Sequence, residues 1–154
     1  MSRYAEALEK RAFRSMSQRE ATAIVHTMYV SFIVPGPPQP KERPRKGRGG
    51  RFYTPDATRS YERALRLYAL AAVRKSGWPM ATRAPVVVTL RVFFPDKRRR
   101  DLDNAVKCLD GANGVIWYDD AQIEELHVYR AVDRARPRLE VTVEILVDSV
   151  GGKV

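Results

Sequence analysis

The chain has 154 residues, a mass of 17.6 kDa and a net charge of +10, which is the size of one domain with a sizeable core. No run of 18 uncharged apolar residues is present, and charged side chains interrupt the first 25 residues, so we expect neither a transmembrane helix nor a signal peptide. The single cysteine, Cys108, excludes an internal disulfide, and with only His26 and His127 beside it a His/Cys metal cage is excluded too. We expect a cytoplasmic protein in which any metal is held by oxygen ligands.

The charge is distributed unevenly along the chain. Residues 1–100 carry 22 basic and 7 acidic side chains, whereas residues 101–154 carry 6 basic and 11 acidic ones. The positive excess favours a polyanionic partner, nucleic acid before membrane. A protein that only binds nucleic acid has no need of acidic clusters, but a nuclease needs them to hold a divalent cation beside a phosphate.

The first residues differ in character from the rest. We predict a polar helical or partly disordered extension over residues 1–27, a folded domain over residues 28–148 and a tail over residues 149–154. Within the domain, residues 27–34 are rich in β-branched and aromatic side chains and are predicted to form a strand, which the following prolines end.

Residues 41–51 are predicted to be a mobile and strongly basic loop. Its basic side chains are Lys41, Arg43, Arg45, Lys46, Arg48 and Arg51. One glutamate leaves the segment at +5, and its glycines allow close approach to a DNA backbone. We expect these side chains to bind DNA; the alternative is a solvated charged linker.

Residues 54–76 form the clearest helical segment. We expect Thr54 as the N-cap, Pro55 as the first helical residue and Gly77 as the end. The apolar side chains at helical spacing, which predict the buried stripe, are Tyr61, Ala64, Leu65, Tyr68, Ala69 and Ala72.

The later elements complete a β-α-β-α-β-β order. Residues 86–94 are largely apolar on both faces and predict a central strand, and residues 103–113 predict a short helix. Residues 123–132 and 138–147 read as an antiparallel pair joined by a short turn. This order predicts an α+β fold with a mixed β-sheet packed with two main helices.

Two pairs of aspartates are the features that point to chemistry. Asp101 and Asp103 directly follow the basic run Lys97, Arg98, Arg99 and Arg100. Residues i and i+2 of an extended chain point the same way, and on the following helix Lys107 shares a face with Asp103. The adjacent Asp119 and Asp120 point to opposite faces, so we expect one of them to reach the site and the other to cap a turn.

A hard divalent cation explains why carboxylates would gather in a basic protein. Clustered carboxylates repel one another, and Mg²⁺ removes that cost while binding carboxylate, water and phosphate oxygens. The cation would polarise the phosphate and activate a water, and a nearby lysine would stabilise charge in the transition state. The alternative is that each aspartate only caps a helix or turn.

The run Arg99-Arg100-Asp101-Leu102-Asp103-Asn104, followed by Lys107 and by Asp119-Asp120-Ala121-Gln122-Ile123, resembles the RusA family of Holliday-junction resolvases of bacteria and their phages. Val34-Pro35-Gly36-Pro37-Pro38 and Tyr53-Thr54-Pro55 extend the resemblance, which covers about residues 28–147. It implies a homodimeric endonuclease that requires Mg²⁺, with Mn²⁺ as a substitute, and cuts four-way DNA junctions by paired symmetric nicks.

The resemblance also assigns roles. It implies that Asp101, Asp103 and Asp120 bind the metal and that Lys107 is catalytic, and we interpret the further match Asp110 as structural. The expected partner is branched DNA, and we expect no membrane and no nucleotide cofactor. Two alternatives stay open: a junction-binding protein without cleavage, and a nuclease of the same fold that acts on forks, flaps or RNA.

Overall fold

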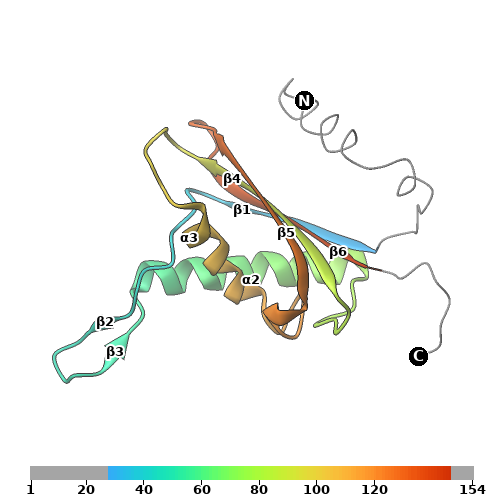
Figure 1. Ribbon diagram of the computed structural model, residues 1–154, viewed down its shortest axis with the longest axis horizontal. Helices are drawn as coiled ribbons and strands as arrows, with labels where there is room; N and C mark the ends of the chain where they lie inside the picture. Colours follow the sequence, from blue (N-terminus) through green and yellow to red (C-terminus); the bar gives the residue numbers. More distant parts are fainter. Residues whose placement is uncertain (1–27, 147–154) are drawn as a thin grey trace. The chain divides into compact units, whose positions relative to one another are not determined.

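A computed structural model describes residues 28–146; the expectations for residues 1–27 and 149–154 lie outside the described residues. The described part is an α+β unit built on a mixed four-stranded sheet, as predicted (Figure 1). The strand bounds are Tyr29–Pro35 for β1, Val86–Phe94 for β4, Ile123–Val132 for β5 and Arg138–Ile145 for β6.

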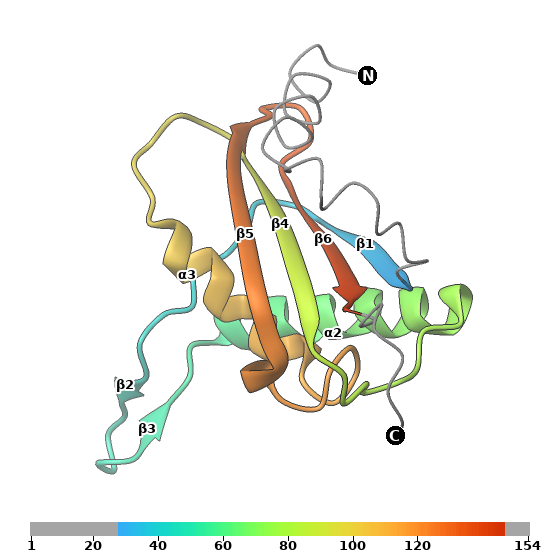
Figure 2. The same ribbon diagram turned by 45° about the vertical axis from the view of Figure 1, so that its right-hand side comes forward.

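The strands lie in the order β1-β6-β4-β5 (Figure 2). β6 pairs antiparallel with both β1 and β4, and β4 pairs parallel with β5. β4 is therefore central, as its apolar composition predicted.

The predicted pairing of the last two strands is wrong. β5 and β6 do not pair with each other, because β4 lies between them. The backbone N–H of Asp133 donates to the carbonyl oxygen of Phe94 at 2.9 Å, so the connection passes over the end of β4. The very apolar β4 gains partners on both edges in this arrangement, whereas the mostly exposed β5 takes the edge of the sheet.

The main helix, α2, spans Asp56–Ser76 and ends at Gly77, whose φ of +73° suits glycine. Its N-cap is Pro55 rather than the predicted Thr54, because Pro55 already has the extended backbone that a cap requires (φ −55°, ψ 146°). The buried stripe includes the predicted Tyr61, Leu65 and Ala69, but Tyr68 is exposed.

A second helical segment follows β4. The α-helix α3 covers Leu102–Val106 and continues as the 3₁₀ helix η1 over Lys107–Ala112, which together match the predicted short helix. η1 lies against α2 so closely that a methyl group on Gly111 would lie 2.7 Å from the Glu62 carbonyl oxygen.

No helix within residues 28–146 has the length and hydropathy to cross a membrane.

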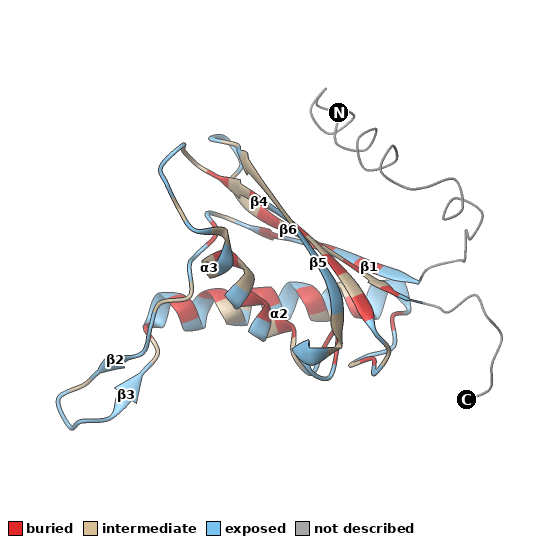
Figure 3. Cartoon of the chain, viewed as in Figure 1, coloured by how far each residue is buried: buried red, intermediate tan, exposed pale blue. Residues whose placement is uncertain are grey.

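The hydrophobic core lies between these helices and one face of the sheet (Figure 3). Alternate residues of β1, β4 and β6 are buried there, together with Leu65 from α2 and the fully buried Trp117. The opposite face of the sheet carries the partly or fully exposed residues of the same strands.

The basic segment contains a hairpin that was not predicted. β2, Arg45–Lys46, pairs antiparallel with β3, Phe52–Tyr53. Between them Gly47 donates to the Arg51 carbonyl at 2.9 Å, and Gly50 takes a φ of +76°. The expected loop is therefore the turn of a two-stranded ribbon.

Candidate active site and nucleic-acid interface

The first pair of acidic residues lies at the start of α3. Asp101 is the N-cap residue, with an extended backbone (φ −80°, ψ 127°), and its carboxylate makes no capping hydrogen bond. Asp103 lies in the first turn, and its carboxylate is 3.1 Å from the Lys107 ammonium. All three side chains are exposed. The predicted spacing of Asp103 and Lys107 on one helical face is confirmed.

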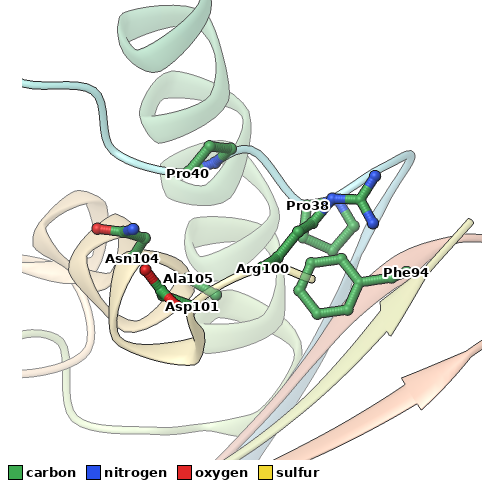
Figure 4. Close-up of a pocket in the computed structure, with 7 residues that line it drawn as sticks. All are labelled: Pro38, Pro40, Phe94, Arg100, Asp101, Asn104 and Ala105. Atoms are coloured by element: carbon green, nitrogen blue, oxygen red, sulfur yellow. The ribbon is translucent and has the colours of Figure 1, made fainter. Parts of the chain in front are cut away.

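An open cavity of about 260 Å³ lies beside Asp101 (Figure 4). The prolines of the connection between β1 and β2 form one wall, and the end of β4 and the start of α3 form the others. The lining residues are Pro38, Pro40, Phe94, Arg100, Asp101, Asn104 and Ala105. The Asp101 carboxylate is thus accessible from solvent through a depression that lies beside the basic run.

Part of that basic run is used inside the protein. The Arg100 guanidinium donates to both carboxylate oxygens of Asp96, at 2.6 and 3.2 Å, and this interaction lowers the pKa of Asp96 to about 2. Arg130 on β5 donates to the carbonyl oxygens of Arg98 and Arg100, at 2.6 and 3.3 Å. These bonds hold the backbone of the segment, while the side chains of Lys97, Arg98 and Arg99 stay exposed.

The second acidic pair lies in a tight turn, the 3₁₀ helix η2 over Asp120–Gln122. Asp119 caps it by accepting from the Ala121 N–H at 2.9 Å, while the exposed Asp120 takes no part in the cap. Gln122 closes the cap by accepting from the Asp119 N–H at 2.9 Å and fixes the turn by donating to the Thr82 and Ala84 carbonyls.

The prediction that one of the adjacent aspartates caps a turn is confirmed for Asp119, whereas a role of Asp120 in the site stays a prediction. The positioning role of Gln122 was missed. An acidic residue followed three positions later by glutamine is the spacing of a capping box, and that signal could have identified it.

The structure does not gather all the predicted metal ligands. Within residues 28–146, no three carboxylate, histidine or cysteine side chains converge in a group that could hold a metal ion. Asp120 is thus not grouped with Asp101 and Asp103. The two carboxylates of α3 alone are hard oxygen donors of the kind that Mg²⁺ uses together with water and substrate phosphates, so their chemistry fits such an ion.

Lys41 was expected to bind DNA, but its ammonium interacts with two carboxylates of the protein. It pairs with Asp110 of η1 and lies 3.3 Å from Glu62 of α2. The hydrogen bond to Asp110 is the main cause of its raised pKa. The other basic side chains of the segment are exposed, and Arg45 also pairs with Glu42 at 2.6 Å.

The family model for endodeoxyribonuclease RusA matches residues 35–144. This range includes the basic hairpin, α3 and the second acidic turn. The chain belongs to the RusA family. The matched residues make up most of the described domain. Both acidic segments therefore lie within the part of the chain that is similar to the family.

Several RusA proteins are similar over nearly their whole length. A crossover junction endodeoxyribonuclease RusA of Shigella sonnei is 30% identical over 122 residues, which cover 73% of this chain and 92% of the relative. The protein of the same name from Escherichia coli is 27% identical with the same coverage. The one from Enterobacteria phage HK97 is 28% identical, over 73% of this chain and 91% of the relative.

Proposed function

We propose that this protein is a crossover junction endodeoxyribonuclease, which cuts four-way DNA by hydrolysing phosphodiester bonds in the presence of a divalent cation. The observation that carries the proposal is the exposed group of Asp101, Asp103 and Lys107 at the start of α3, beside exposed basic side chains. The names of the RusA relatives support the choice of substrate.

Asp101 and Asp103 are the residues that would hold the cation; Asp120, the third ligand that the family resemblance implies, is not grouped with them within residues 28–146. Mg²⁺ is the preferred ion and Mn²⁺ its substitute; the bound cation would supply charge neutralisation at the phosphate and a more acidic water. The Lys107 ammonium donates to the Asp103 carboxylate at 3.1 Å and to the Asn104 side-chain oxygen at 3.3 Å. Its ammonium is thereby positioned to stabilise negative charge that develops on the phosphate.

The basic side chains bind and orient the DNA. Lys97, Arg98 and Arg99 lie next to Asp101 in the chain and would contact phosphates close to the scissile bond. The hairpin carries a second group, at Arg43, Arg45, Lys46, Arg48 and Arg51. Lys41 and Arg100 have a different role, since their ion pairs fix the two segments that carry these groups.

We also propose a homodimer that acts on DNA in the cytoplasm. Each chain supplies one set of Asp101, Asp103 and Lys107, whereas paired nicks at symmetric positions of a junction need two. A two-fold dimer presents two identical sites to the two-fold symmetric substrate.

The proposal is tested by incubating the purified protein with labelled four-way junction, Y-fork and linear duplex, with and without Mg²⁺. We expect paired symmetric nicks in the junction only, and only with the cation. Asp101→Asn and Asp103→Asn should each remove cleavage and leave junction binding intact. Preferential cutting of the fork would favour the alternative nuclease, and junction binding without cutting would favour a non-catalytic protein.

A further inference from the structure

The hairpin carries an aromatic side chain that has no role in the folded chain. Phe52 on β3 is 72% exposed, the highest value of any large hydrophobic residue within residues 28–146. It belongs to a two-stranded ribbon that forms no part of the main sheet and buries none of its strand residues. A single exposed apolar side chain is common on protein surfaces, so it is the basic side chains around Phe52 that favour a nucleic-acid partner for the ring.

The pairing within the ribbon defines what surrounds Phe52. Lys46 is its cross-strand partner, so the two side chains share one face of the ribbon, while Arg45 and Tyr53 share the other. Tyr53 is exposed as well, at 49% against 72% for Phe52. Phe52 is therefore the more exposed of the two aromatic residues, and a lysine stands beside it.

The base of the ribbon is fixed to the elements of the acidic site. The Glu42 N–H donates to the Thr58 hydroxyl of α2 at 3.2 Å, and the Lys41 N–H donates to the Asn104 carbonyl of α3 at 3.3 Å. The ion pairs of Lys41 add contacts to α2 and η1. The ribbon extends away from the sheet (Figure 1), and its base is anchored beside Asp101 and Asp103.

We propose that Phe52 stacks on an unpaired or unstacked base at the branch point of the DNA while Lys46 contacts an adjacent phosphate. This inference rests on the proposed function and deepens it by assigning recognition of the branch to the ribbon. The five exposed basic side chains of the segment attract a polyanion, and an aromatic ring among them can stack on any base because every base has a π-face. In linear duplex the bases are already stacked on one another, so the contact distinguishes branched from linear DNA.

The test uses four-way junctions in EDTA, which prevents cleavage. One junction carries 2-aminopurine next to the branch point and another carries it in the middle of an arm. We expect the wild-type protein to change the fluorescence of the first probe only, and Phe52→Ala to remove that change. The same variant should lose between about fivefold and more than a hundredfold in junction affinity, the range typical of one stacked base, with little change on linear duplex.

Three further variants at positions 52 and 46 separate base stacking from apolar contact and from charge. Phe52→Trp should restore junction affinity and the fluorescence change, whereas Phe52→Leu, which is apolar but not aromatic, should not. Lys46→Ala should weaken binding to both DNAs and leave the fluorescence change. Met80→Ala is a matched control, because Met80 is 60% exposed and lies outside the ribbon; it should change nothing.

Two results would overturn the inference. If Phe52→Ala bound the junction as the wild type does and kept the fluorescence change, this face of the ribbon would be left to a protein partner. Equal losses of affinity for junction and for duplex would show that Phe52 contacts DNA in general and does not recognise the branch point. If the wild-type protein did not prefer the junction over duplex, the proposed function itself would be contradicted. That comparison uses the wild type alone, so it is separate from the test of Phe52.

Discussion

Lys41 and Asp110 lie 69 residues apart in the chain and form an ion pair that joins the start of the basic segment to η1. Lys41 also lies 3.3 Å from Glu62, so one ammonium connects the basic segment, α2 and η1. η1 continues α3, which carries the acidic residues of the site. The pair therefore couples the position of the basic ribbon to the position of the helix that carries Asp103.

Lys41→Met is expected to destabilise the fold at neutral pH, by no more than about 1 kcal/mol because the pair is partly exposed. The pKa of Lys41 is raised in the folded state, chiefly by Asp110. The contribution of Lys41 to stability is therefore fully present below its usual pKa near 10.5 and is lost as the pH rises through the raised value. Urea unfolding of wild type and variant should differ at pH 7 and converge in strong alkali. If the difference in unfolding free energy between wild type and variant stayed constant with pH, the packing of the Lys41 side chain would matter and its charge would not.

Asp119→Ala and Asp120→Asn should separate structure from catalysis. Asp119 caps the turn, and loss of a cap costs about 1 kcal/mol, so the first variant should unfold at a lower temperature. The Asp120 side chain makes no capping bond, so the second variant should keep its stability and junction affinity but lose cleavage. Thermal unfolding and single-turnover cleavage of both variants check this. Normal turnover by Asp120→Asn would remove Asp120 from the proposed ligand set.

Lys107→Ala should slow cleavage far more than it weakens binding. Its ammonium is one charge among many for affinity, but a charge directed at the transition state is worth ~3 kcal/mol, or about a hundredfold in rate. Lys107→Arg keeps the charge and serves as the matched control, with a smaller loss expected. The measurements are junction affinity in EDTA and single-turnover rate at saturating protein. Equal losses in affinity and rate would make Lys107 an ordinary DNA contact.

The exposed basic residues of the ribbon segment should control the salt dependence of binding. Each phosphate contact contributes a slope of ~0.9 in the logarithm of affinity against the logarithm of salt concentration. Changing Arg43, Arg45, Lys46, Arg48 and Arg51 to Ala should flatten this slope, with a much smaller effect on saturated turnover. An unchanged slope would assign the binding surface to Lys97, Arg98 and Arg99 instead. Lys41 is kept in this variant because it pairs within the protein.

The features that could be predicted from the sequence are those determined by neighbouring residues. The periodicity of α2, the apolar run of β4 and the spacing of Asp103 and Lys107 act over a few positions, and each was found where expected. The partner of β5 depends on contacts across the whole sheet, so a short connection to β6 was misleading. The ion pair of Lys41 could not be predicted for the same reason, because its partner Asp110 is distant in the chain.

The missed hairpin has another cause. Its strands are two residues long, which is too short for an alternating pattern to be recognised, and its charge suggested a loop. Exposure of Phe52 could not be inferred either, since an aromatic residue in a sequence is more often part of a core. Only the separation of the ribbon from the main sheet shows that this side chain has nothing to pack against.

The contact between Gly111 and α2 limits how this region of the chain can change. Because a methyl group there would lie 2.7 Å from the Glu62 carbonyl oxygen, any side chain at position 111 would push η1 away from α2. η1 is continuous with α3, so the displacement would reach Lys107 and Asp103 at the surface. A substitution at this contact between two helices would thus alter the geometry of the acidic site without touching DNA. Loss of activity at this position would look like a catalytic defect, although its origin is the spacing of two backbones.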